Sequence, residues 1–156
     1  MEQNLKELLL ALNKHRVKYV IVGGYAVFVH AQPRMTKDMD VFIESSPENA
    51  KSIYAALAEF GAALGDFTIE DFHTPTIIAR FGVPPHCFDV LQRIDGIDFS
   101  TVYANSEELL VDDEMPVRYI SAADLITNKL ASGRLQDLAD VEAIRQAQAA
   151  AHKGKE

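Results

Sequence analysis

The feature that most constrains this chain is an apolar strand that breaks at two adjacent glycines near the N-terminus. Residues 17–22 are mostly apolar and rich in β-branched and aromatic side chains, which predicts a strand buried on both faces. Gly23-Gly24 ends that strand, and residues 25–31 are expected to form a short helix. The helix should stop before Pro33, because a proline disfavours helical backbone in the residue that precedes it.

The strand that follows the proline carries two carboxylates on one of its faces. Asp38 and Asp40 alternate with apolar residues in the predicted strand 38–44, so both carboxylates point to the same side. At the rise of a strand they lie about 6.6 Å apart, and at an effective dielectric constant of about 20 they repel each other by about 2.5 kcal/mol. Stability gives no reason for this placement unless the face is open to water or a cation lies between the side chains.

A third carboxylate occurs in a later apolar segment. Asp89 lies among apolar residues in the predicted strand 86–92. If this strand is adjacent to strand 38–44, three carboxylates converge. Oxygen ligands of this kind suit Mg²⁺ or Mn²⁺, which share their coordination shell with water and substrate phosphates. The chemistry that uses such a site is in-line displacement at phosphorus.

The two glycines supply the other half of a phosphate site. Glycines at a strand-to-helix turn let backbone amides approach a phosphate closely, and the start of a helix adds a partial positive charge. The dinucleotide pattern G-x-G-x-x-G fails here, because Tyr25 and Phe28 occupy the positions that need glycine when counting begins at Gly23. A phosphate loop of the type G-x-x-x-x-G-K is absent from the sequence as well.

The rest of the chain reads as helices and short strands without an internal repeat or a linker. Helices are expected at residues 2–14, 46–60, 98–104, 121–133 and 134–149, with a fraying tail after the last of them. Further strands are expected at residues 76–81, 109–111 and 117–120, with a turn at 82–85 and a loop at 65–74. The expected fold class is α/β (α+β), in one domain (1–156) with a core at 17–95 and a C-terminal hairpin and helices at 96–150.

Composition narrows the class of protein. A chain of 156 residues is one domain in length, and 48% apolar residues are enough for a folded core. The single cysteine, Cys87, excludes an internal disulfide and a multi-cysteine metal site. No apolar run approaches the roughly 20 residues of a membrane span, and the N-terminus lacks a signal-peptide pattern, so a cytoplasmic protein without a membrane partner is expected. The net charge of −8 argues against broad, non-specific binding of nucleic acids.

Four sequence motifs occur in a fixed order along the chain. They are Gly23-Gly24-Tyr25-Ala26, Pro33-Arg34-x-Thr36-Lys37-Asp38-x-Asp40, Phe88-Asp89-Val90-Leu91, and a run from Lys129 through Arg134 and Asp137 to Asp140. In this order they resemble the nucleotidyltransferase superfamily of the polymerase β type, and most of all its small bacterial members related to the AbiEii and MenT toxin proteins. The resemblance covers roughly residues 17–145. One departure is Tyr25, because many members carry a serine or threonine hydroxyl at this turn.

The resemblance implies a nucleotidyltransferase fold, in which helices and a C-terminal helical layer flank a short mixed β-sheet. It also implies transfer of a nucleoside monophosphate from an NTP to an acceptor hydroxyl, with pyrophosphate leaving. On this interpretation Asp38 and Asp40 hold the metal ions, and Asp89 is the third ligand or helps to activate the acceptor. Gly23 and Gly24 hold the β- and γ-phosphates.

The resemblance also implies supporting roles around the triphosphate. Arg34 and Lys37 are candidate phosphate contacts, because both precede the carboxylates at the edge of the expected cleft. Thr36 shapes the entry into the strand. Tyr25 follows the glycines directly and is a candidate to stack on the base of the nucleotide.

The C-terminal motif has two interpretations. In the first, Lys129 reaches the triphosphate from the helical layer, and Asp137 and Asp140 orient Lys129 or Arg134. In the second, all four residues form an ion-pair network that ties two helices together, since charged pairs three residues apart are common on helices.

The acceptor, and the activity itself, leave alternatives open. The acceptor is tRNA or another RNA, a protein hydroxyl, or a small molecule such as an aminoglycoside. The acidic net charge favours a cationic small molecule or a protein, whereas the basic run at residues 14–18 favours RNA. A second hypothesis is a catalytically silent member of the same fold that binds a nucleotide or a partner protein, for example in a toxin–antitoxin pair. A third is a plain α/β interaction module, which leaves the repulsion between Asp38 and Asp40 unexplained.

Overall fold

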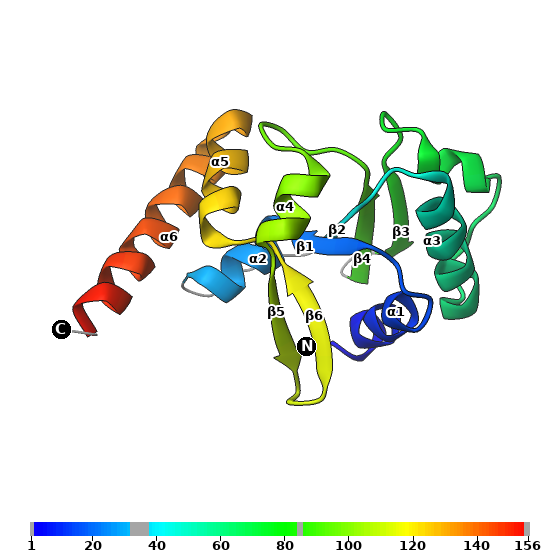
Figure 1. The fold of residues 1–156 in the computed structure, drawn as a ribbon, viewed down its shortest axis with the longest axis horizontal. Coiled ribbons are helices and arrows are strands. Elements are labelled where there is room, and N and C mark those ends of the chain that lie inside the picture. The colour runs from blue at the N-terminus through cyan, green and yellow to red at the C-terminus, as the bar shows by residue number, and fades with distance from the viewer. Residues whose placement is uncertain (1, 32–37, 84–85, 155–156) are drawn as a thin grey trace.

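A six-stranded mixed sheet is the centre of the computed structural model, which describes residues 2–31, 38–83 and 86–154 (Figure 1). The strands are arranged in the order β3-β4-β2-β1-β6-β5. Their bounds are β1 Tyr19–Val22, β2 Asp38–Ile43, β3 Ala79–Val83, β4 His86–Leu91, β5 Glu107–Val111 and β6 Met115–Tyr119. A mixed sheet flanked by helices confirms the fold class expected from the sequence.

The centre of the sheet is built from the strands that carry the predicted site. β2 pairs with β1 in antiparallel and with β4 in parallel orientation, so the two carboxylate-bearing strands are direct neighbours. β1 pairs with β6 in parallel orientation. The two edges are antiparallel hairpins, β3–β4 on one side and β5–β6 on the other. β2 and β4 are therefore adjacent, as the convergence of the three carboxylates requires.

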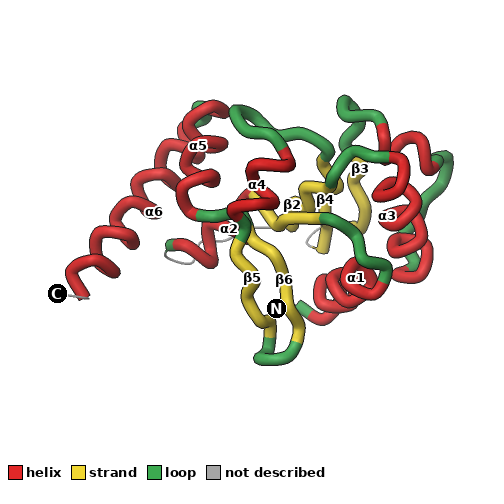
Figure 2. Tube along the Cα trace, viewed as in Figure 1, coloured by secondary structure: helices red, strands yellow, loops and turns green. Residues whose placement is uncertain are grey.

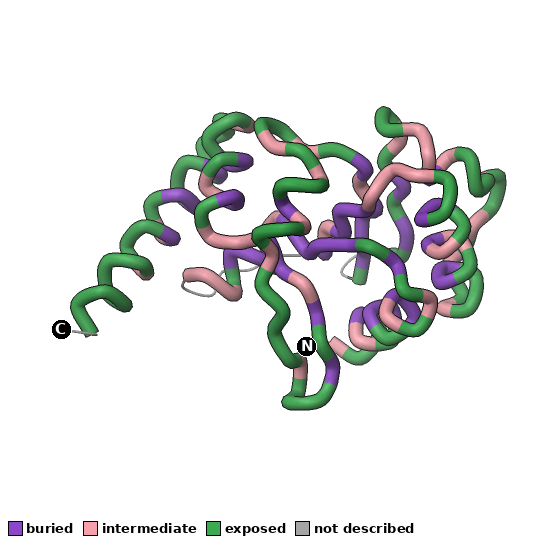
Figure 3. Tube along the Cα trace, in the orientation of Figure 1, coloured by how far each residue is buried: buried purple, intermediate pink, exposed green. Residues whose placement is uncertain are grey.

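Side-chain alternation along the strands divides the core into two clusters, one on each face of the sheet. Met39, Val41 and Ile43 lie in the first cluster, whereas Phe42 lies in the second. The first face is covered by α1 (Gln3–Lys14) and α3 (Pro47–Phe60). The second face is covered by α2 (Gly23–His30), α4 (Phe99–Asn105), α5 (Ala122–Ser132) and α6 (Leu135–Gly154). Figure 3 shows the buried positions gathered along the strands and the inner sides of the helices.

Helix ends follow the capping signals in the sequence. The Ser46 side chain accepts a hydrogen bond from the Asn49 amide at the start of α3, and Gly61 ends that helix with a φ of 92°. Ser121 caps α5 in the same way, and Gly133 ends it with a φ of 68°. The backbone at Gly61 and Gly133 is left-handed, which glycine adopts without a steric penalty.

Several segment bounds differ from the sequence prediction (Figure 2). β5 and β6 each begin two residues earlier than expected, at Glu107 and Met115. The predicted loop 65–74 contains a short 3₁₀ helix, Ile69–His73, which buries Phe72 against the core. The helix forms because Thr68 and Asp71 cap it reciprocally. β3 begins at Ala79 instead of residue 76 and continues through Val83, so half of the predicted turn 82–85 belongs to the strand.

The last helix is longer than predicted. α6 continues to Gly154, because the alanines that were expected to fray are strong helix formers. None of the helices in the described part of the chain combines the length and the apolar character that a membrane crossing requires.

Candidate active site

Three carboxylates meet on the second face of the sheet. Asp40 of β2 lies directly opposite Asp89 of β4, on neighbouring parallel strands, where the spacing is about 4.8 Å. Asp38 precedes Asp40 by two residues and shares its face. Burial, followed by the charges of Asp89 and Asp38, raises the pKa of Asp40 from 3.8 to about 6, although Lys129 and Arg80 act in the opposite direction. The site therefore concentrates negative charge around one partly buried carboxylate.

The glycine turn lies against the same carboxylate. α2 begins at Gly23 itself, two residues earlier than predicted, so the amides of Gly23 and Gly24 belong to the first turn of the helix. Gly23 has a φ of +67°, and a Cβ atom at this position would lie 2.2 Å from Oδ2 of Asp40. A glycine is required here both by the backbone angle and by the close approach of the Asp40 side chain.

Arg80 is a site residue that the sequence analysis missed. It lies on β3 directly opposite Asp89. Its Nε and Nη2 donate hydrogen bonds to Oδ1 and Oδ2 of Asp89 at 2.9 and 3.0 Å, and Nη2 also donates to Oδ2 of Asp38 at 3.4 Å. These contacts, above all the hydrogen bond to Asp89, raise the pKa of Arg80. Arg80 thus bridges two of the three predicted metal ligands.

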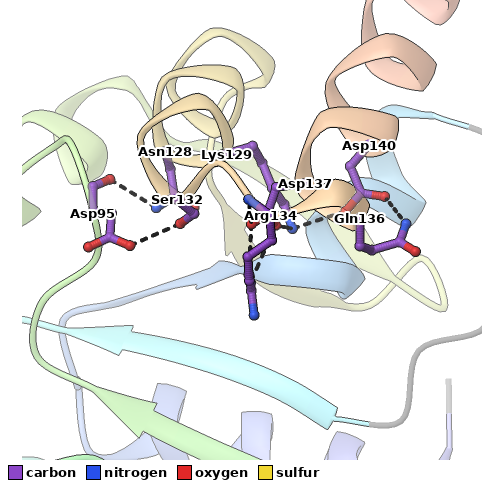
Figure 4. A network of polar contacts seen from close by, with 8 residues as sticks. All are labelled: Asp95, Asn128, Lys129, Ser132, Arg134, Gln136, Asp137 and Asp140. Carbon is purple, nitrogen blue, oxygen red and sulfur yellow. Dashed lines mark hydrogen bonds and ion pairs between the residues drawn. The ribbon is translucent and has the colours of Figure 1, made fainter.

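The C-terminal motif forms a buried ion-pair network between α5 and α6 (Figure 4). Lys129 Nζ lies 3.1 Å from Oδ1 of Asp137 and 3.0 Å from Oδ2 of Asp140, and all three side chains are at most 6% exposed. Arg134 Nε donates to Oδ2 of Asp137 at 2.8 Å. Gln136 Nε2 donates to Oδ1 of Asp140 at 2.9 Å. Burial opposes ionisation of Asp137, but the hydrogen bonds from Arg134 and Lys129 outweigh it and lower its pKa.

Both interpretations of the C-terminal motif are compatible with these contacts. Lys129, with its two carboxylate partners, ties α5 to α6, as the ion-pair alternative requires. Lys129, Arg134 and Asp137 also line the cleft described next, whereas Asp140 does not. Contact between Lys129 and a triphosphate stays a prediction.

A cleft of about 1200 Å³ connects the carboxylates with the C-terminal helices. Its lining includes Gly23, Gly24, Asp38, Asp40, Arg80, Asp89, Arg93, Asp95, Gly96, Lys129, Ser132, Arg134 and Asp137. One wall of the cleft is the loop that carries Asp95, which is fixed to α5, since Asn128 Nδ2 donates to the Asp95 carbonyl at 2.9 Å and Ser132 donates to Oδ2 of Asp95 at 3.0 Å (Figure 4). This volume exceeds the roughly 300–1,000 Å³ of typical ligand pockets, so the cleft has room for a small ligand.

Arg34, Thr36 and Lys37 lie outside the described residues. Tyr25 is described and does not line this cleft. Tyr25 packs against the first core cluster, and burial, followed by the charges of Glu2 and Asp38, raises the pKa of its hydroxyl group. Stacking of Tyr25 on a base stays a prediction.

The carboxylates are not arranged as a finished metal site. In residues 2–31, 38–83 and 86–154, no three His, Cys, Asp or Glu side chains are placed to hold a metal ion together. Both Asp89 oxygens face the guanidinium of Arg80 instead. The donor set still fits a hard cation, because Asp38, Asp40 and Asp89 offer oxygen ligands whose mutual repulsion a divalent ion would relieve. The metal-ligand role of these residues stays a prediction.

Comparison with sequence families identifies the chain. Residues 1–148 match the model of the family described as "Nucleotidyltransferase of unknown function (DUF6036)". The chain belongs to this nucleotidyltransferase family. No curated protein has significant similarity to its sequence.

Solved structures show the same fold despite low sequence identity. The lincomycin-bound crystal structure of the lincosamide antibiotic adenylyltransferase LnuA superposes with a TM-score of 0.62 at 15% identity, and the match covers 94% of this chain and 98% of LnuA. The solution structure of the antibiotic-resistance factor ANT(2″)-Ia has a TM-score of 0.59 at 13% identity, covering 94% and 82% of the two chains. The crystal structure of ANT(2″)-Ia with adenylyl-2″-tobramycin has a TM-score of 0.58 at 14% identity, covering 97% and 89%.

The comparisons confirm two of the sequence predictions. The fold is that of nucleotidyltransferases of the polymerase β type, and the chain is a nucleotidyltransferase by its family. The interpretation as a plain α/β interaction module is therefore wrong.

Proposed function

We propose that this protein transfers a nucleoside monophosphate from an NTP to a hydroxyl group of an acceptor, with Mg²⁺ or Mn²⁺ as cofactor, in the cleft described above. The observation that carries this proposal is the placement of Asp40 directly opposite Asp89 and against the Gly23 turn. This places carboxylates for a cation beside helix amides for an anion, as a metal–triphosphate substrate requires.

Different residues of the chain bind the phosphates and the metal ion of the substrate. The amides of Gly23 and Gly24 are free of intrahelical partners in the first turn of α2 and bind the β- and γ-phosphates. Asp38, Asp40 and Asp89 hold the metal, which when bound offsets the negative charge of the phosphates. Arg34 and Lys37 remain candidate phosphate contacts.

The reaction proceeds by in-line displacement at the α-phosphorus. The acceptor oxygen forms a bond to this atom while the bond to the oxygen that leads to the β-phosphorus breaks, and pyrophosphate leaves. Asp89 accepts the proton of the acceptor hydroxyl. Arg134 is 77% exposed at the cleft while Asp137 accepts hydrogen bonds from its Nε and Nη2, so its Nη1 can contact the phosphates.

A small molecule with several hydroxyl groups is the acceptor that the structure favours. LnuA binds lincomycin and ANT(2″)-Ia holds adenylyl-2″-tobramycin, and both superpose along nearly the whole length of this chain. Three residues of the basic run at 14–18, which favoured RNA, contact carboxylates: Lys14 forms an ion pair and His15 a hydrogen bond with Glu59, and Lys18 forms an ion pair with Glu44. ATP is the first donor to test, because both neighbours are associated with adenylyl transfer. A protein or RNA acceptor, as in toxin–antitoxin systems of the cytoplasm, is the alternative outcome.

The test is a labelling experiment with each of the four α-³²P-labelled NTPs. The protein is incubated with Mg²⁺ and a bacterial lysate separated into small molecules, RNA and protein, and the fraction that gains label identifies the acceptor class. The Asp40→Asn variant is the control and should give no label. Equal labelling by the variant would contradict the proposed site. NTP binding in calorimetry without label in any fraction would favour the catalytically silent alternative.

A further inference from the structure

Arg80 already holds the carboxylates that the proposed cation needs. Its guanidinium makes a two-pronged contact with Asp89, at 2.9 and 3.0 Å, and a third contact with Asp38 at 3.4 Å. Two-pronged contacts of this kind are among the strongest charge-assisted hydrogen bonds in proteins. A divalent ion therefore meets Asp89 and Asp38 in competition with a cation that belongs to the chain.

The two sides of this contact differ in their freedom to move. The Asp89 side chain is 12% exposed, whereas the Arg80 side chain is 61% exposed at the cleft. Ala79 and Phe81, on either side of Arg80, are buried in the first core cluster and fix the strand. The guanidinium can thus leave Asp89 by rotating its own side chain, without any change in the sheet.

A guanidinium and a divalent cation cannot occupy the same edge of Asp89. Both are positive, and at contact distance their repulsion is large in a partly desolvated cleft. One of them must leave when the other binds. In a cleft that holds a nucleotide, a displaced Arg80 finds a new partner in the triphosphate, to which guanidinium groups bind with the same fork geometry.

We propose that Arg80 is a built-in counter-cation: it holds Asp89 and Asp38 while the cleft is empty, gives them up to the metal, and then contacts the triphosphate. The inference rests on the proposed function, because it requires that the carboxylates bind metal. Its consequence is that the empty protein binds the metal weakly and the metal–NTP complex well. Arg80 thus couples metal entry to nucleotide entry.

The first test is a titration with Mn²⁺ alone, followed by electron paramagnetic resonance of the free ion. Arg80→Gln should bind Mn²⁺ about tenfold more tightly than the original protein, the ratio that corresponds to loss of one charged hydrogen-bonded contact of about 1.4 kcal/mol. Arg80→Lys keeps the charge but loses the fork, so its affinity should lie between the two. Arg93→Gln is the matched control, because Arg93 lines the same cleft but makes no hydrogen bond or ion pair with these carboxylates; its affinity should change less than threefold.

A second measurement follows the Arg80 side chain directly. In ¹⁵N-labelled protein, the Arg80 Nε–H signal, assigned by its loss in Arg80→Lys, should shift as Mg²⁺ saturates the site, because its hydrogen bond to Asp89 is broken. In calorimetry with a non-transferable NTP analogue and Mg²⁺, Arg80→Gln should bind the complex more weakly than the original protein. Arg80→Gln is thus expected to bind the metal alone more tightly and the metal–NTP complex more weakly. Substitution of a residue that only stabilises the fold would not change the two affinities in opposite directions.

Three results would overturn the inference. Equal or weaker Mn²⁺ binding by Arg80→Gln would show that Arg80 stays beside Asp89 and supports it as a ligand. An Nε–H signal unchanged by saturating Mg²⁺ would show the same. Absence of Mn²⁺ binding at millimolar concentration in both proteins would remove the competition altogether. Whether the proposed function then also fails is decided separately, by the labelling experiment with NTPs.

Discussion

The carboxylate of Asp40 lowers the stability of the metal-free protein, and its removal should raise it. In Asp40→Asn a neutral amide of nearly the same shape replaces the carboxylate. The pKa of Asp40 is raised from 3.8 to about 6 by burial and by Asp89 and Asp38, and this difference corresponds to about 3 kcal/mol. Because the pKa is higher in the folded than in the unfolded protein, folding favours the protonated carboxyl group, and the ionised group opposes folding.

The sign of the effect fixes its pH dependence. Below pH 3.8 the carboxyl group is protonated in both states and has no effect, whereas above pH 6 the full destabilisation is present. Asp40→Asn should therefore increase the free energy of unfolding by up to about 3 kcal/mol at pH 8 and by less than about 1 kcal/mol at pH 4. The assay is urea unfolding at both pH values with a chelator present, followed by circular dichroism.

The matched control is Asp66→Asn, in an exposed carboxylate of the loop after α3. This variant should change the free energy of unfolding by less than about 0.5 kcal/mol at either pH. A destabilised Asp40→Asn variant at pH 8, or an equal gain at pH 4 and pH 8, would refute the electrostatic account of the site.

Two further substitutions test the elements that surround Asp40. Gly23→Ala should destabilise the protein by about 2–3 kcal/mol and abolish transfer, because its Cβ would lie 2.2 Å from Asp40 Oδ2 at a φ of +67°. Thermal unfolding measures the loss of stability. A stability close to that of the original protein would contradict the close approach of Asp40 to Gly23. Lys129→Met should destabilise the protein by about 3 kcal/mol, because Asp137 and Asp140 lose a buried cation. Urea unfolding measures this loss of stability. A loss below about 1 kcal/mol would show that the ion-pair network is not needed for stability.

Each of these substitutions has a matched control in the chain. Gly61 also has a left-handed backbone, with a φ of +92°, but no atom lies within 4 Å of a Cβ built there. Gly61→Ala therefore measures the effect of the backbone angle alone, and its difference from Gly23→Ala measures the clash. Lys153→Met removes a cation from the exposed end of α6 and should leave the free energy of unfolding nearly unchanged.

The convergence of the carboxylates could be predicted, because it depends on local patterns. Strict alternation in residues 38–44 assigns Asp38 and Asp40 to one face, and an apolar run around Asp89 indicates a second buried strand. The pairing of these two strands is a long-range contact, and the sequence supported it only through the resemblance to a family. The structure adds the register, in which Asp40 and Asp89 are direct partners.

Arg80 could not be predicted, because its role depends on the register of a hairpin. With the turn placed at residues 82–85, symmetrical pairing would set Arg80 opposite Cys87. The strand instead continues through Gly82, whose left-handed backbone lets His86 and Val83 pair, and this moves Arg80 opposite Asp89. The expected register is wrong by two residues, so it assigns Arg80 to the correct face of the sheet but pairs it with Cys87 instead of Asp89.

The C-terminal motif was ambiguous for a different reason. A Lys129 side chain that lines a cleft and one that ties two helices have the same sequence pattern, since Asp137 and Asp140 lie one helical turn apart in either case. Only the packing of α6 on α5 shows that both carboxylates contact Lys129. The start of α2 at Gly23 also depended on packing, because Asp40 occupies the space that a side chain would need.

The most direct measurement follows the two ends of the triphosphate in one reaction. With the acceptor fraction, Mg²⁺ and ATP labelled either at the α- or at the γ-phosphate, the original protein should place α-label on the acceptor and release γ-label as pyrophosphate, whereas Asp40→Asn should do neither. Transfer of γ-label to the acceptor, release of γ-label as free phosphate, or equal transfer of α-label by Asp40→Asn would contradict nucleotidyl transfer at the site formed by Asp38, Asp40 and Asp89.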